Sequence, residues 1–104
     1  MTRASRDKGN RFERQIVATA LEHDLKAVRV PLSGAAAGFK DDVIVRAPHG
    51  EPWRLEVKKR AGGFKQIYAW LATADALIIG ADRQRPLAVL DLEDFFALLK
   101  EGDQ

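Results

Sequence analysis

The segment DDVIVRA, residues 41–47, constrains the fold more than any other part of this sequence. Its successive apolar residues Val43, Ile44 and Val45 are typical of a strand that is buried on both faces. The turn-forming segment PHGE separates it from PWRLEVKK, residues 52–59, so the two segments are expected to pair as a hairpin. A strand buried on both faces requires helices packed on its sheet.

The remaining patterns supply those helices and further strands. In chain order, the expected elements are a helix at 7–23, strands at 26–32, 41–47 and 52–59, a helix at 64–73, strands at 74–80 and 86–91, and a helix at 92–99. The order α-β-β-β-α-β-β-α predicts an α/β fold, a mixed central sheet flanked by helices. Residues 1–104 are expected to form a single domain, with residues 1–6 as a flexible basic extension.

Composition excludes several classes of protein. Hydrophobic residues make up 46% of the chain and charged residues 31%, as in an ordinary soluble globule. No apolar run approaches the ~20 residues that span a bilayer, so no membrane association is expected. The start of the chain is basic without a following apolar core, which is unlike a secretory signal. The absence of cysteine excludes disulfides and thiolate metal sites and fits a reducing cytoplasm.

Charge is distributed unevenly although the net charge is only +2. One basic cluster lies near the start of the chain and another near its middle. Their members are Arg3, Arg6, Lys8 and Arg11, and then Lys58, Lys59, Arg60 and Lys65. Such clusters are equally compatible with phosphate binding and with a solvated basic surface.

The segment LEVK places an acid and a base on one face of a strand. Residues two apart in a strand point the same way, so Glu56 and Lys58 project together. Alone, this pattern favours an exposed ion pair. The hairpin, however, brings Asp42 to the same edge of the sheet, and neighbouring carboxylates repel unless a cation lies between them. Oxygen ligands suit Mg²⁺ or Mn²⁺, and Lys58 could then act on a bound phosphodiester.

The first expected helix carries a further acid. Gly9 and Glu13 are four residues apart and therefore share a helix face. A functional role for Glu13 and a surface pairing with Arg6, Asn10 or Gln15 are about equally supported.

Taken together, the segments KGNRFER, VPLSGAAAGFKDDVIV and RLEVKKR resemble the PD-(D/E)XK nuclease superfamily, and most of all the archaeal-type Holliday junction resolvases, including phage-borne relatives. The resemblance runs from Lys8 to about Ala72 with order and spacing intact. It implies a restriction-endonuclease-like fold and a Mg²⁺-dependent endodeoxyribonuclease, with Mn²⁺ as a substitute. It further implies a homodimer that resolves four-way DNA junctions by paired symmetric nicks.

The resemblance also assigns site residues. Its catalytic set comprises Glu13, Ser33, Asp42, Glu56 and Lys58. The metal ligands it implies are Asp42, Glu56, the backbone carbonyl of Val57, and Glu13 directly or through water. The DNA-binding candidates are Lys8, Arg11, Ser33, Lys59, Arg60, Lys65 and Gln66.

One position departs from the family pattern, because Asp41 stands where the proline of the motif is expected. Either Asp41 or Asp42 could therefore be the metal ligand. Asp42 is favoured because it directly precedes the apolar strand residues.

Other functions remain open on the sequence. The same fold could cut flaps or other branched DNA, or could be a catalytically silent DNA-binding module, or the motifs could be coincidental in a structural domain. The expected dimer interface is also open between the second helix and the region 87–99. Tyr68 and Trp70 cannot share a helix face, so one is expected in the core and the other at a DNA or dimer contact.

Overall fold

The computed structural model describes residues 3–30 and 42–102. The elements are α1 (Arg3–Glu22), β1 (Lys26–Val30), β2 (Asp42–Arg46), β3 (Trp53–Glu56), α2 (Lys65–Leu71), β4 (Leu77–Ile79), β5 (Leu87–Val89) and α3 (Leu92–Glu101). The first helix begins earlier than predicted, at Arg3 instead of residue 7. Within the described ranges, no helix is long and apolar enough to cross a membrane.

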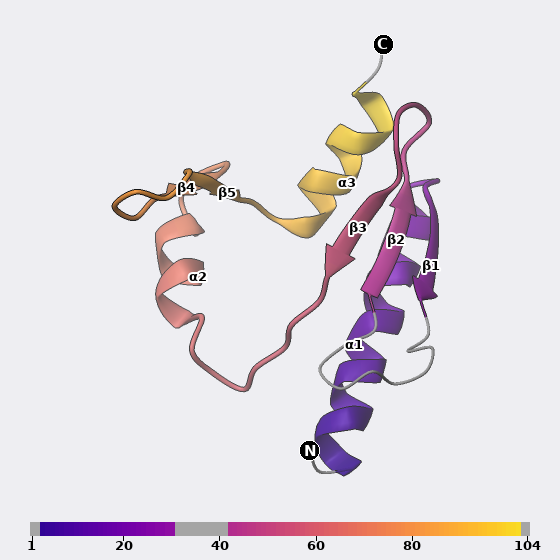
Figure 1. The fold of residues 1–104 in the computed structure, drawn as a ribbon, viewed down its shortest axis with the longest axis horizontal. Helices are drawn as coiled ribbons and strands as arrows, with labels where there is room; N and C mark the ends of the chain where they lie inside the picture. The colour runs from indigo at the N-terminus through magenta and orange to yellow at the C-terminus, as the bar shows by residue number, and fades with distance from the viewer. Residues whose placement is uncertain (1–2, 31–41, 103–104) are drawn as a thin grey trace.

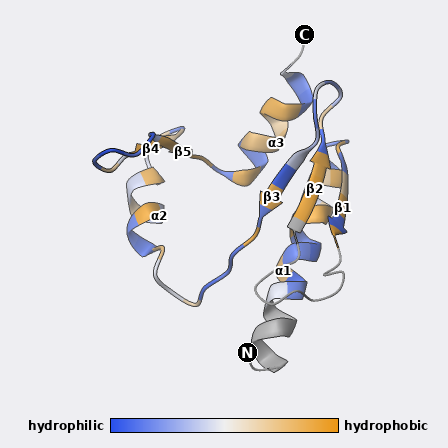
Figure 2. Cartoon of the chain, in the orientation of Figure 1, coloured by the Kyte–Doolittle hydropathy of each residue, from blue (hydrophilic) through white to orange (hydrophobic). Residues whose placement is uncertain are grey.

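The main sheet has three antiparallel strands in the order β1-β2-β3. β2 lies in the centre, as expected from its run of apolar residues, which Figure 2 shows as the orange strand between its two neighbours. The predicted hairpin is confirmed, since β2 pairs with β3 from Val45 opposite Trp53 to Asp42 opposite Glu56.

The hydrophobic core lies between one face of this sheet and the helices α1 and α3. Val43 and Val45 of β2 are fully buried there against Ile16 and Ala20 of α1 and Phe96 of α3. Alternation along β2 places position 42 and Ile44 on the opposite face of the sheet. In the described part of the chain, both helices that pack on this sheet therefore cover the same face.

Helix α1 is followed by a residue in the left-handed conformation, Asp24, whose φ is 61°. The N–H of Leu25 donates to the carbonyl of Ala20, and the N–H of Asp24 donates to that of Leu21. These bonds satisfy carbonyls that the end of a helix would otherwise leave unpaired. The resulting reversal places Leu25 in the core and starts β1 beside α1.

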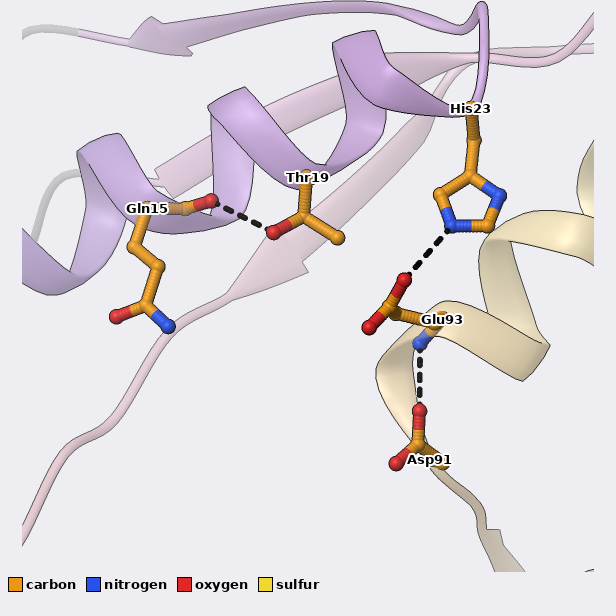
Figure 3. A network of polar contacts seen from close by, with 5 residues as sticks. All are labelled: Gln15, Thr19, His23, Asp91 and Glu93. Atoms are coloured by element: carbon orange, nitrogen blue, oxygen red, sulfur yellow. Dashed lines mark hydrogen bonds and ion pairs between the residues drawn. The ribbon is translucent and has the colours of Figure 1, made fainter.

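Polar contacts fix α3 across the end of α1. Figure 3 shows His23 at the end of α1 facing Glu93 in the first turn of α3, with Nε2 and Oε1 3.4 Å apart. Lys100, in the last turn of α3, donates from Nζ to the backbone carbonyl of Asp24 at 3.3 Å. Both ends of α3 are thus attached to the same reversal of the chain.

Asp91 caps α3, and its removal should weaken the helix. Its side chain accepts a hydrogen bond from the N–H of Glu93 at 2.9 Å. Asp91→Ala is expected to lower the free energy of unfolding by about 1 kcal/mol, because the N–H of Glu93 loses its acceptor. Urea denaturation would measure this, with Asp75→Ala as the control. A change no larger than that of the control would contradict the capping role.

The second half of the chain departs from the predicted architecture. β4 and β5 form a separate two-stranded antiparallel sheet, so the described strands do not make the single mixed sheet that the sequence predicts. Figure 1 shows the cause: after β3 the chain runs away from the sheet before α2 begins, and β4 does not reach the edge of β3. We call residues 64–90, which hold α2, β4 and β5, the arm.

Residues of the arm are also less buried than predicted. Tyr68 and Trp70 are both exposed, and α2 has no buried residue, so the expectation that one of the two aromatic residues belongs to the core is wrong. Only α3, after the arm, returns to the main sheet. Its Phe95 meets Trp53 of β3 edge to face, with ring centroids 5.4 Å apart.

Candidate active site

At one end of the main sheet, one residue from each of the three strands lies in a single row across the sheet. Val30 is opposite Asp42, and Asp42 is opposite Glu56. Directly opposed residues of antiparallel strands share a face and have Cβ atoms about 5 Å apart. The register therefore brings positions 42 and 56 together on the face that α1 and α3 leave uncovered.

Lys58 joins this row from just beyond β3. Its Nζ lies 3.4 Å from Oε2 of Glu56, which matches the prediction that the two side chains project together. Both side chains are exposed, so the pair contributes at most about 1 kcal/mol to stability. An exposed carboxylate and ammonium held next to each other remain accessible to a ligand.

Glu13 is buried, only 7% exposed, and is paired with an arginine that the sequence did not single out. Arg29 of β1 donates a hydrogen bond from Nε to Oε1 of Glu13 at 3.0 Å, and its Nη2 forms an ion pair with the same oxygen at 2.9 Å. Arg29 also donates from Nη2 to Oδ1 of Asn10 at 3.0 Å. Of the two alternatives for Glu13, the surface pairing does not fit a buried side chain, and Arg29 lies on a strand that packs against α1.

Arg29 links Glu13 to the same end of the sheet as the Asp42–Glu56 row. Arg29 is opposite Val43, one residue from Asp42, and so lies on the face that α1 covers. Glu13 and Glu56 consequently occupy opposite faces of the sheet near one end of it. The structure brings together positions 42, 56 and 58, and places Glu13 behind them.

Two of the predicted DNA-binding cations contact aromatic rings. Nζ of Lys59 lies 5.0 Å from the ring centroid of Phe12 in α1, and the guanidinium of Arg60 lies 5.2 Å from that of Phe64. Cation–π contacts of this length hold the stem of a basic residue while its charge stays at the surface. The contact with Phe12 fixes the segment after Lys58 against the helix that carries Glu13.

The other predicted residues are distributed as follows. Ser33 and Asp41 lie outside the described residues, and for Lys8 and Asp42 the structure describes the backbone, which is in α1 and β2. Arg11 is exposed on α1. Lys65 and Gln66 begin α2, which Figure 1 shows well apart from the main sheet, so they are not brought to this site.

The donor set can be compared with what Mg²⁺ requires. Position 42 and Glu56 offer carboxylates from directly opposed positions, and hard oxygen ligands are those that Mg²⁺ prefers. Among the described residues there is no group of three acids or histidines arranged to hold a metal. The pair at positions 42 and 56 thus fits an ion that keeps several waters, as Mg²⁺ does, while Glu13 is already engaged by Arg29.

Fold and candidate site together define an α/β protein in which two acidic positions on neighbouring strands lie beside a lysine at one end of the main sheet. A family model described as archaeal Holliday junction resolvase (Hjc) matches residues 4–90. The chain belongs to this family of nucleases, which act on branched DNA. No curated protein and no solved structure matches the chain.

Proposed function

We propose that this protein is a metal-dependent, structure-selective endonuclease that resolves four-way DNA junctions by paired symmetric nicks. The observation that carries the proposal is the register of the Asp42–Glu56 row beside Lys58, in a chain that belongs to the resolvase family. Acids and lysine share one uncovered face of the sheet, where a phosphodiester has access to them.

In the proposed mechanism, Asp42, Glu56 and the backbone carbonyl of Val57 would hold Mg²⁺, or Mn²⁺ in its place. Glu13 is paired with Arg29 on the other face of the sheet and would act by supporting the site from behind. The ion, when bound, supplies charge stabilisation and lowers the pKa of a water molecule. The protein contributes the fixed spacing of its acids, because both come from hydrogen-bonded strands and not from loops.

Lys58 is the proposed positioning group for the nucleophile. Its ammonium can bind the attacking water and the charge that develops on the phosphate oxygens. The water oxygen would bond to phosphorus and release a proton to solvent, the P–O3′ bond would break, and the 3′ oxygen would take up a proton from solvent. The products are a 5′-phosphate and a 3′-hydroxyl. Ser33, which lies outside the described residues, is a further proposed contact to the scissile phosphate.

Symmetric cutting needs a pair of active sites, and a two-fold homodimer supplies them. Each copy would cut one of two strands placed symmetrically about the crossover. We place this activity in the cytoplasm. Recognition would rest on the shape of the branch, since basic residues bind the DNA backbone and carry no sequence information.

A substrate panel tests the proposal. Labelled four-way junction, flap and linear duplex would be incubated with the protein in Mg²⁺, in Mn²⁺ and in chelator. Symmetric nicks on the junction in metal alone would support it. Cleavage of the flap instead would keep the site and change the substrate. Tight binding without cleavage in either metal would identify a silent binding module.

Lys59 gives a test of the proposed DNA contact. Lys59→Gln is expected to weaken binding to junction, flap and duplex alike and to reduce the slope of log K against log salt by about 1, because one phosphate contact is lost. Fluorescence anisotropy over a range of salt would measure it. Lys26→Gln is the matched control. Lys26 is opposite Arg46 in the β1–β2 register, at the far end of the sheet from the candidate site. Equal slopes for the two variants would exclude Lys59 from the DNA interface.

A further inference from the structure

Arg54 of β3 lies on the same uncovered face of the main sheet as the candidate site. The register sets Val28, Ile44 and Arg54 in one row across the three strands, directly beside the row that ends in Glu56. Arg54 and Glu56 are two residues apart on one strand, so their side chains project to the same side. Arg54 is exposed, as are Glu56 and Lys58. A guanidinium is therefore presented beside the acids, on the side away from Lys58.

Charge alternates along this edge of the uncovered face. Arg54 is positive, Glu56 negative and Lys58 positive, at steps of two residues. The step from Arg54 to Glu56 spans about 6.6 Å along the strand. Successive phosphates of a DNA strand are separated by a comparable distance. When one phosphate lies over Glu56, the next one along the same DNA strand can therefore reach Arg54.

The acidic row needs cations beside it if a polyanion is to bind there. Carboxylates facing the phosphates of a DNA strand oppose its approach, because like charges are brought together. Lys58 is already engaged with Glu56, with 3.4 Å between Nζ and Oε2. In the row next to the acids, Val28 and Ile44 are apolar and Arg54 supplies the charge.

The cations also indicate which way a bound DNA strand runs. Lys58, Lys59 and Arg60 continue from the end of β3, whereas the residues of β2 are largely apolar. Figure 2 shows this contrast between β3, which is partly blue, and the orange β2 beside it. A backbone that follows β3 meets a cation on each side of Glu56, and one that crosses the sheet to β1 does not.

We propose that Arg54 binds the phosphate next to the scissile one, on the side away from Lys58. Its planar guanidinium can donate two parallel hydrogen bonds to a phosphate, a geometry that lysine does not offer. Contacts to two adjacent phosphates fix the position and the direction of the strand, whereas a single contact would let it pivot. This inference rests on the proposed nuclease function and adds a positioning contact to its site.

Arg54→Gln is expected to raise the dissociation constant for a four-way junction about tenfold at low salt, because a charge-assisted hydrogen bond is lost. Arg54→Lys keeps the charge and should stay within about threefold of the wild type. Arg46→Gln is the matched control, since Arg46 is an exposed arginine on the same face, opposite Lys26 at the far end of the sheet. Fluorescence anisotropy in chelator would measure binding without cleavage, and urea denaturation would verify that the variants are folded.

A neutral methylphosphonate, placed at one phosphate at a time in two opposing strands of the junction, locates the contact. At the phosphate that Arg54 binds, this substitution should weaken wild-type binding about tenfold and leave the binding of Arg54→Gln unchanged, because the pair is already broken. At other phosphates, the two proteins should lose affinity equally. The same scan with Lys58→Gln identifies the phosphate that Lys58 contacts. The phosphate coupled to Arg54 should be its immediate neighbour in the strand.

The scan has outcomes that overturn the proposal. Equal losses at every phosphate would make Arg54 a surface residue without a DNA contact. Coupling only at phosphates remote from the one that Lys58 binds, or an equal loss of affinity in Arg46→Gln, would also overturn it. Coupling at the neighbouring phosphate without cleavage in any metal would support the Arg54 contact and end the nuclease proposal. Cleavage without coupling would do the reverse, so the two proposals can fail separately.

Discussion

Glu56→Gln is expected to lower the rate of junction cleavage roughly 1,000-fold while leaving the affinity for the junction within a few fold. Removing one preorganised charged group from a phosphoryl or acyl transfer site costs rates of this order, because the group acts mainly on the transition state. Glutamine keeps the size and the strand position of Glu56 and removes its charge. Single-turnover cleavage and binding in chelator would measure the two quantities separately.

Glu51→Gln is the control for this comparison. Glu51 is exposed in the turn between β2 and β3, on the same hairpin, and faces no proposed ligand. Its variant should cleave at the wild-type rate. If Glu56→Gln cut as fast as Glu51→Gln, the ion pair with Lys58 would be a surface contact and the site would lie elsewhere. If both rate and affinity fell together, Glu56 would be a binding or folding residue.

The hairpin could be predicted from sequence because its determinants are local. The apolar run of Val43 to Val45 identifies a central strand, the PHGE turn limits how the next strand can pair, and the two-residue period then fixes which side Glu56 and Lys58 share. The structure adds the register, which sets position 42 directly opposite Glu56. The cap of α3 is equally local, since Asp91 interacts with a residue only two positions along the chain.

The pairing of Glu13 could not be predicted in the same way. Helical spacing identifies neighbours three and four residues away, and Arg29 is sixteen residues from Glu13. Glu13 and Arg29 meet only because α1 packs on β1 with Glu13 on the side of the helix that faces the strand. Arg29 belongs to the strand segment KAVRV. From sequence alone, a charged residue in such a strand is expected to face solvent, but in the structure it lies on the inner face. Once the structure shows that Glu13 is buried, a basic partner for it is required, and Arg29 on β1 is that partner.

The tertiary placement of the second half of the chain could not be predicted from local sequence patterns either. Each of α2, β4 and β5 exists close to its predicted range, yet hydrophobic periodicity does not state which sheet a strand joins. Sequence favours one mixed sheet because neighbouring strands usually pair. The extended segment after β3 instead carries α2 away from the edge of that strand.

Arg29→Gln is expected to destabilise the fold by about 3 kcal/mol, because it removes the positive charge of Arg29 from beside the buried carboxylate of Glu13. The value is at the low end for a buried pair since the side chain of Arg29 is 29% exposed. A loss of this size is a large part of the stability of a small domain and corresponds to a fall in Tm of roughly 12–24 °C. Urea denaturation and thermal unfolding would measure it, with Arg14→Gln on the exposed side of α1 as the control.

The double variant Glu13→Gln/Arg29→Gln separates a charge effect from simple loss of packing. With both charges removed, the amides can bond to each other, so the double variant should be more stable than Arg29→Gln alone, with a coupling of at least about 1 kcal/mol. Additive losses would mean that Arg29 acts through its stem and not through Glu13. Because Lys59 packs on Phe12, next to Glu13, a loosened α1 would also displace the segment that holds Lys58. The stability of this ion pair and the geometry of the proposed site are therefore physically linked.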